Sequence, residues 1–160
     1  MRWVASLAGI GFLPGPAGTF GSLVALPLAW AAHQLGGPLF LINLTVFAFL
    51  TGYIATARAT QGGDHDPSWV IVDELVGQWI ALLPVSIGAA YAGAAVLDLW
   101  PGWVAAFVLF RLFDIWKPWL VGRADAMHGP LGVMLDDVVA GVFAAISVFA
   151  LGALFHLVLI

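Results

Sequence analysis

The sequence contains no cysteine, and charged side chains make up only 9% of its 160 residues. The absence of thiols excludes disulfide bonds, thiolate metal sites and every mechanism that uses a cysteine nucleophile. Only five residues are lysine or arginine, and they form no basic run, which excludes a nucleic-acid-binding surface. Any hydrolytic chemistry must therefore use carboxylates, hydroxyls, histidine or a bound metal.

Apolar residues are correspondingly abundant. They make up 62% of the chain, and the mean hydropathy is +1.04, whereas soluble domains are about half apolar. One helical crossing of a bilayer takes about 20 residues, so about four or five crossings would use most of this chain. We therefore predict a single domain over residues 1–160, built as an all-α, polytopic integral membrane bundle of about five helices.

Glycine and proline divide the chain into segments. Residues 9–21 are rich in both and are expected to form a loop, in which Thr19 caps the next helix. A Gly-Gly-Pro turn at residues 36–38 ends that helix, and Asp66-Pro67 is typical of a helix N-cap followed by proline. The predicted helices are residues 20–34, 39–57, 67–83, 103–116 and 133–160, with a polar connection at 117–130. Residues 84–102 form either an outer hairpin or extensions of the flanking helices.

Charged residues gather on one side of the bilayer in this arrangement. With the N-terminus in the cytoplasm, five crossings place the polar stretches at residues 58–66 and 117–130 on the cytoplasmic side. All five basic residues and every acidic residue except Asp98 then lie at or near that face. The positive-inside rule favours this orientation.

Two eight-residue segments resemble each other: VIVDELVG at residues 70–77 and VMLDDVVA at residues 133–140. Each places two adjacent carboxylates between apolar residues. The acids are Asp73 and Glu74 in the first segment and Asp136 and Asp137 in the second. Gly77 and Gly141 each lie four residues beyond a carboxylate, on the same helix face. The two helices are therefore expected to approach each other closely at the acids.

A structural explanation of these acids is that the helix dipole favours them in a first turn. It suits Asp136 and Asp137, near the start of their expected helix. It does not suit Asp73 and Glu74, because a helix that starts at Pro67 holds them about 10 Å from its end. An ionised acid at such depth costs roughly 2.5 to 3.5 kcal/mol and normally faces a functional cavity.

Four converging carboxylates would repel one another unless a cation lay between them. Because the ligands are oxygens, we expect Mg²⁺ first and Mn²⁺ second. The expected metal ligands are Asp73, Glu74, Asp136 and Asp137. The segment Asp64-His65-Asp66 is either a solvated loop or the source of a further ligand or base.

Arg111, Asp114 and Lys117 recur every three residues and so share one helix face. They form either a membrane-interface belt, whose cations reach the headgroups, or a cluster that binds phosphate. Arginine and lysine are the side chains that phosphate binding requires. Arg111 lies deeper in the membrane than Lys117 and beside Asp114, which favours the phosphate-binding cluster.

Further candidates for anion binding precede two of the helices. The segment GPAGTFGS at residues 15–22 can present backbone N–H groups and the hydroxyls of Thr19 and Ser22, although it lacks the lysine of a Walker A sequence. His128 lies near Asp136 in the chain and is a candidate for substrate binding.

Four motifs together resemble those of the phosphatidylglycerophosphatase A family, bacterial enzymes that dephosphorylate phosphatidylglycerophosphate to phosphatidylglycerol. They hold most of the polar residues and follow the family's order. The motifs are PGPAGTFGS near the N-terminus, His65-Asp66 followed by VDELVG, FRLFDIWKPW at residues 110–119, and MHGPLGVMLDDVVAG at residues 127–141.

The resemblance implies a Mg²⁺-dependent phosphomonoesterase of the bacterial inner membrane that acts on a phospholipid headgroup at the cytoplasmic face. Arg111 and Lys117 become the expected phosphate contacts. The residues that become metal ligands or catalytic candidates are Asp66, Asp73, Glu74, Asp114, Asp136 and Asp137. The expected partners are the membrane and the lipid substrate, without nucleic acid, and an oligomer is compatible with the sequence.

Two mechanisms and two rival functions remain open at this point. Water attacks phosphorus directly, or a carboxylate first forms an aspartyl-phosphate; the D-x-D segment at Asp64 lacks a preceding apolar strand, which favours direct attack. The main rival is a small transporter or ion-conducting protein, since intramembrane carboxylates also relay ions. Confinement of the acids to one face argues against it. A lipid-binding subunit without activity would not need four carboxylates.

Overall fold

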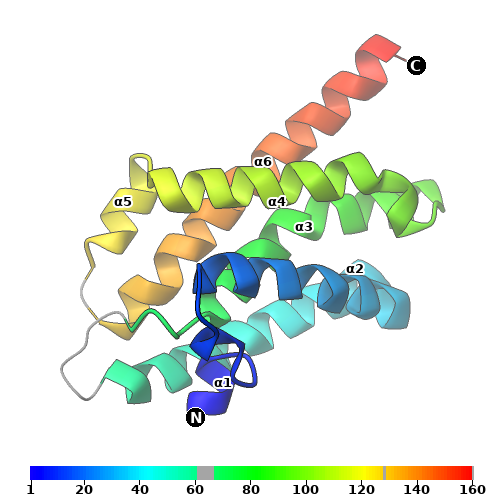
Figure 1. Ribbon diagram of the computed structural model, residues 1–160. Coiled ribbons are helices and arrows are strands. Elements are labelled where there is room, and N and C mark those ends of the chain that lie inside the picture. Colours follow the sequence, from blue (N-terminus) through cyan, green and yellow to red (C-terminus); the bar gives the residue numbers. More distant parts are fainter. Residues whose placement is uncertain (61–66, 128, 160) are drawn as a thin grey trace.

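The computed structural model describes residues 1–60, 67–127 and 129–159, which are mostly helical with no strand among them (Figure 1). Four helices are long and apolar enough to cross a membrane, which confirms the predicted all-α membrane bundle. The elements are α1 (Arg2–Ala5), η1 (Ile10–Phe12), α2 (Ala17–Ala59), α3 (Val72–Ala92), η3 (Val96–Leu99), α4 (Trp100–Trp116), α5 (Leu120–Asp125) and α6 (Pro130–Leu159).

The longest element, α2, is two helices joined by a sharp reversal. Gly36 and Gly37 leave helical geometry, and Gly37 has a φ of 63°, a left-handed conformation that favours glycine. A straight helix of 43 residues would be about 65 Å long, roughly twice the hydrocarbon thickness of a bilayer. Figure 1 shows the chain turning back at this point. The predicted turn at residues 36–38 is therefore confirmed, and with α3, α4 and α6 the two halves of α2 supply five apolar segments.

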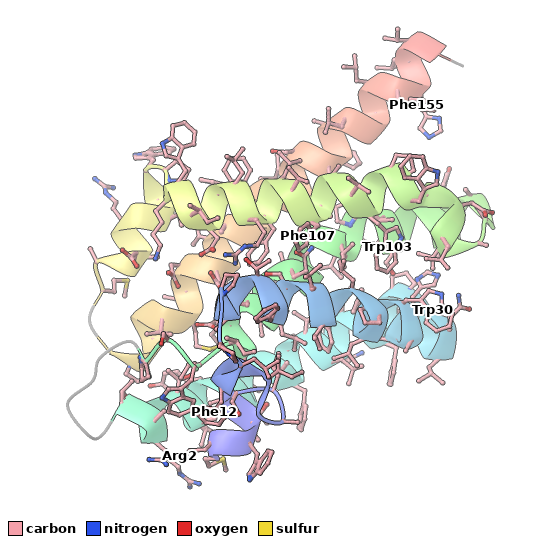
Figure 2. All side chains as sticks on the ribbon, viewed as in Figure 1. Arg2, Phe12, Trp30, Trp103, Phe107 and Phe155 are labelled. Carbon is pink, nitrogen blue, oxygen red and sulfur yellow. The ribbon has the colours of Figure 1, made fainter. Side chains whose placement is uncertain are left out.

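The exterior of the bundle is largely apolar, as a lipid-facing surface requires. Trp30 and Phe155, labelled in Figure 2, are 41% and 54% exposed. The α3 helix is the central element, because it contacts α2, α4 and α6 and buries large side chains such as Leu82 and Trp79.

The predicted start of the third helix at Pro67 was wrong, because α3 begins at Val72. The preceding segment makes tertiary contacts instead: the Ile71 N–H donates to the Ala5 carbonyl oxygen at 2.8 Å. A Cβ placed on Gly11 would lie 2.0 Å from the Trp69 carbonyl oxygen, so the two segments touch backbone to backbone. These contacts with the N-terminal segment override the local signal for a helix start.

Other predicted boundaries also shift. The α3 helix continues through Pro84 to Ala92, as membrane helices tolerate proline, and η3 leads into α4 at Trp100. Residues 84–102 therefore mostly extend the flanking helices, one of the two alternatives left open. The polar connection contains α5, and α6 begins at Pro130 rather than residue 133.

The predicted loop at residues 9–21 was partly wrong, because α2 begins at Ala17, with Pro16 before it. Thr19 consequently lies in the first turn and caps nothing. The glycines here serve close packing: a Cβ on Gly18 would lie 1.9 Å from Glu74 Oε1, and one on Gly21 would lie 3.0 Å from Glu74 Cβ.

These shifts reverse the predicted depths of the two acid pairs. Asp73 and Glu74 occupy the first turn of α3. Asp136 and Asp137 lie in the second turn of α6, because that helix begins at Pro130 and has no acid in its first turn. The helix-dipole explanation therefore applies to the first pair and not to the second.

The close approach predicted at Gly77 and Gly141 is confirmed. A Cβ on Gly141 would lie 2.4 Å from the Gly77 carbonyl oxygen, and one on Gly77 would lie 2.6 Å from the Asp137 carbonyl oxygen. Backbone therefore meets backbone where α3 crosses α6, and this crossing holds the two acid pairs next to each other.

We expect Gly77→Ala to lower the stability of the folded protein by about 1 to 3 kcal/mol, the usual cost of overpacking. Gly88→Ala in the same helix is the matched control, because its Cβ would meet only Leu99 Cδ2 at 3.7 Å. The measurement is thermal unfolding in detergent. Equal midpoints for the two variants would show that the crossing is not tightly packed.

Candidate active site

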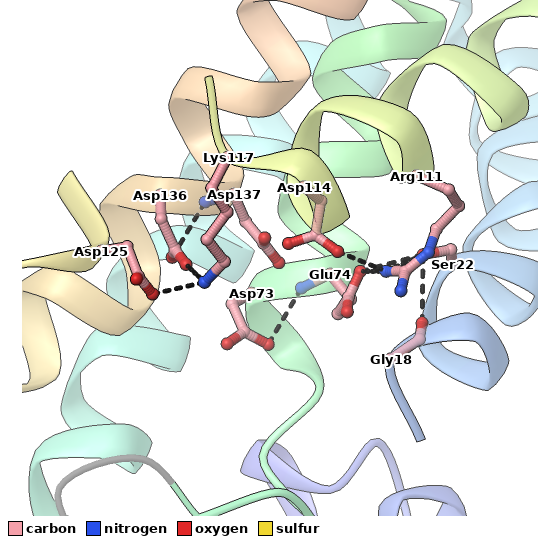
Figure 3. A network of polar contacts seen from close by, with 10 residues as sticks. All are labelled: Gly18, Ser22, Asp73, Glu74, Arg111, Asp114, Lys117, Asp125, Asp136 and Asp137. Carbon is pink, nitrogen blue, oxygen red and sulfur yellow. Dashed lines mark hydrogen bonds and ion pairs between the residues drawn. The ribbon is translucent and has the colours of Figure 1, made fainter. Parts of the chain in front are cut away.

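A polar cavity of about 320 Å³ lies at one end of the bundle. The start of α2, the starts of α3 and α6, the end of α4, and α5 all reach it, because successive apolar segments run in opposite directions. Figure 3 shows the polar contacts around it. Six carboxylates line the cavity: Asp73, Glu74, Asp114, Asp125, Asp136 and Asp137.

Three of these carboxylates form a compact group. One oxygen from each of Glu74, Asp114 and Asp137 lies within 4.8 Å of the others. All three side chains are largely buried, and Asp137 is only 3% exposed. An all-oxygen set of ligands at this spacing suits a hard divalent cation. The geometry thus brings together two of the four predicted metal ligands and adds Asp114, which the sequence had assigned to catalysis.

Charge around the cavity favours a bound cation as well. The six lining carboxylates face two cationic side chains, Arg111 and Lys117, which leaves a formal surplus of four negative charges. Ionised acids held this close and away from water repel one another strongly. A divalent ion would reduce that repulsion.

The two similar segments adopt the same local arrangement. Asp73 Oδ1 accepts a hydrogen bond from the Glu74 N–H at 2.9 Å, and Asp136 Oδ1 accepts one from the Asp137 N–H at 3.0 Å. In each pair the first acid binds the backbone amide of the second acid. The second acid contributes an oxygen to the group of three.

Arg111 lies behind this group. Its guanidinium pairs with Glu74, lies 2.9 Å from Asp114 Oδ2 and donates to Ser22 Oγ at 3.4 Å. The Ser22 hydroxyl, itself fully buried, donates to Glu74 Oε2 at 3.0 Å or to the Gly18 carbonyl oxygen at 3.1 Å. Neither Arg111 nor Ser22 lines the cavity, so the structure does not place these two predicted substrate contacts against it.

Lys117 does line the cavity, on the other side of the carboxylates (Figure 3). It ends α4 in a left-handed conformation, pairs with Asp125, and has its Nζ 2.9 Å from Asp136 Oδ2. Burial by itself lowers the pKa of the Lys117 ammonium, but hydrogen bonds to Asp125 and Asp136 together outweigh it and raise the pKa above the ordinary lysine value. The side chain is therefore a fixed positive charge at neutral pH.

The remaining predicted residues have different outcomes. Thr19 is next to Gly18 but does not line the cavity. Asp66 and His128 lie outside the described residues. Asp125 was missed by the sequence analysis: it lies beyond the end of α4, so no helical periodicity relates it to Lys117, and its position in the polar connection was the only signal.

Comparisons with known proteins agree with the motifs. The phosphatidylglycerophosphatase A family model matches residues 3–152. Phosphatidylglycerophosphatase A of Escherichia coli strain K12 is 35% identical over 146 residues, covering 90% of this chain and 78% of the relative. The Haemophilus influenzae protein of the same name is also 35% identical, with 89% and 83% covered.

A third relative carries a different name. A protein of Bacteroides thetaiotaomicron, provisionally named a phosphatidylinositol-3-phosphatase, is 38% identical over 146 residues, covering 88% of this chain and 86% of the relative. No solved structure matches this chain.

The ion pairs of Lys117 can be tested by its reactivity, since it is the only lysine in the sequence. Only the neutral amine is acylated, and the raised pKa keeps that fraction small. We expect Asp125→Asn to lower the pKa and speed acylation of Lys117 at pH 9, measured by peptide mass spectrometry. The Lys117→Arg variant has no lysine, so its acylation measures the N-terminal amine alone. Asp98→Asn should leave the acylation rate of Lys117 unchanged. Equal rates in wild type and Asp125→Asn would show that the ion pair does not form.

Proposed function

This chain belongs to the phosphatidylglycerophosphatase A family, and we propose that it hydrolyses the terminal phosphomonoester of phosphatidylglycerophosphate, giving phosphatidylglycerol and inorganic phosphate. The observation that carries the proposal is one cavity that combines three clustered carboxylates with a fixed lysine charge. A metal-assisted phosphatase needs both features, because the phosphate must be held while charge on it is neutralised.

The metal that fits the cavity is Mg²⁺, with Mn²⁺ as the alternative. Glu74, Asp114 and Asp137 would hold it, since their oxygens form the closest group. When bound, the ion would supply positive charge to the phosphoryl oxygens during transfer. Asp73 and Asp136, at the edge of this group, remain candidates for catalytic acids.

Lys117 is the side chain that we assign to the phosphate. Its ammonium faces the cavity and is held by Asp125 and Asp136, so it presents a positioned point charge. A terminal monoester carries close to two negative charges at neutral pH, which favours it over a singly charged diester. Water then attacks phosphorus, and a cavity carboxylate takes its proton. As the bond between phosphorus and the ester oxygen breaks, that proton passes to the ester oxygen, which leaves as the lipid hydroxyl.

The position of the cavity suits a lipid substrate. It opens at the end of the apolar segments, where a headgroup would lie while its acyl chains remain in the bilayer. We place this end on the cytoplasmic side of the inner membrane, because the basic residues gather there. A transporter is less well supported, since every described carboxylate except Asp98 lies at this end of the bundle.

A substrate assay tests the reaction. We expect purified protein in mixed micelles to release phosphate with Mg²⁺, fastest from phosphatidylglycerophosphate, more slowly from phosphatidic acid and phosphatidylinositol-3-phosphate, and least from soluble glycerol phosphate. Chelation with EDTA should abolish release. Asp137→Asn should lower the rate by more than about a hundredfold, since even outer-shell partners of a metal cost 10- to 100-fold.

Asp98→Asn is the matched control, because Asp98 lies in η3 at the opposite end of α4 and should keep full activity. Fastest release from phosphatidylinositol-3-phosphate would instead assign this chain the specificity named for the Bacteroides relative. No release from any lipid by folded protein would contradict the phosphatase and favour the transporter.

A further inference from the structure

Arg111 occupies a position that does not suit a phosphate contact. Its side chain is 15% exposed and pairs with two carboxylates of the group of three, Glu74 and Asp114. Figure 3 shows it on one side of these acids, with Lys117 on the other. Because Arg111 does not line the cavity, a phosphate there would meet the carboxylates before it met the guanidinium.

We propose that Arg111 is a positioning residue that fixes Glu74 and Asp114 as metal ligands, and that it does not bind the substrate phosphate. The inference rests on the proposed function, since it concerns the metal that the reaction would use. Glu74 comes from α3 and Asp114 from α4, and one guanidinium holds both, so their separation depends on Arg111. Hydrogen-bond partners of this kind orient metal ligands and strongly affect metal affinity.

The start of α2 completes this arrangement. Ser22 contacts both Glu74 Oε2 and the Arg111 guanidinium. Gly18 leaves the space that they occupy: its Cβ would lie 1.9 Å from Glu74 Oε1 and 3.3 Å from Arg111 Nη1. A glycine and a serine in the first turns of α2 therefore support the ion pair. The glycine-rich motif, which suggested anion binding, therefore contacts a carboxylate of the protein and the arginine paired with it.

Direct binding of Mn²⁺ distinguishes a positioning role from a substrate contact. Free Mn²⁺ is measured by electron paramagnetic resonance during titration of the detergent-solubilised protein, without lipid. We expect Arg111→Lys to weaken Mn²⁺ binding about 10- to 100-fold, because lysine keeps the charge but its shorter side chain cannot place a nitrogen where Arg111 Nη1 contacts Glu74 and Asp114. Ser22→Ala should weaken it less, in the same direction. Arg123→Lys, at an exposed arginine of α5, should bind as wild type does.

Inhibition by inorganic phosphate gives the second measurement. At saturating Mg²⁺, we expect Arg111→Lys to leave the inhibition constant of phosphate unchanged. A roughly tenfold increase in that constant, with Mn²⁺ affinity unchanged, would make Arg111 a substrate contact and overturn the proposal. Tighter Mn²⁺ binding in Arg111→Lys would also overturn it, since the arginine would then only compete with the metal.

Mn²⁺ binding and phosphate release together distinguish a failure of the positioning role from a failure of the proposed function. If wild type binds Mn²⁺ and both variants bind it equally well, only the positioning role fails. If wild type binds no Mn²⁺ yet releases phosphate in EDTA, the metal-dependent function fails and the positioning role fails with it. Should Arg111→Lys not fold in thermal unfolding assays, Ser22→Ala decides: unchanged Mn²⁺ affinity in that variant counts against the proposal.

Discussion

Carboxylates gathered at the end of an apolar bundle repel one another, and the other features of the site offset this repulsion. Six acids line one cavity, and the interior of a protein screens their charges far less than water does. Arg111 compensates on one side and Lys117 on the other. The remaining surplus of negative charge is the physical basis on which we propose a divalent cation at this site.

Close packing of backbone brings these acids together, and this part of the structure was accessible from the sequence. Gly77 lies four residues beyond the first acid of its pair, and Gly141 lies four residues beyond the second acid of its pair. A small residue one turn beyond an acid indicates where helices can touch. The reversal at Gly36 and Gly37 could also be predicted from the sequence. These glycines lie between two long apolar runs, and few residues other than glycine adopt a left-handed conformation. Both signals are local.

The signals that failed were overridden by contacts between distant segments. The local sequence at Pro67 is typical of a helix start. The Ile71 N–H instead donates to the Ala5 carbonyl oxygen, and α3 begins only at Val72. Hydrophobic periodicity does not predict such a contact between distant segments. The membership of the group of three was hidden for a similar reason, since Asp114 joins Glu74 and Asp137 only through the way α4 packs. Adjacency in the chain therefore indicated the two acid pairs, whereas which three carboxylates cluster depends on how the helices pack.

The shared geometry of the two acid pairs has a consequence for how the site is oriented. Both α3 and α6 begin at the cavity, so they run in the same direction and cross at their glycines. The two pairs share one local arrangement, because in each the first acid accepts a hydrogen bond from the backbone N–H of the second acid. Their surroundings differ, because Arg111 pairs with the first acid pair and Lys117 with the second, and only Lys117 lines the cavity. A repeated sequence pattern thereby gives an asymmetric site, in which the cation paired with Glu74 is held away from the cavity and the cation paired with Asp136 lies at it.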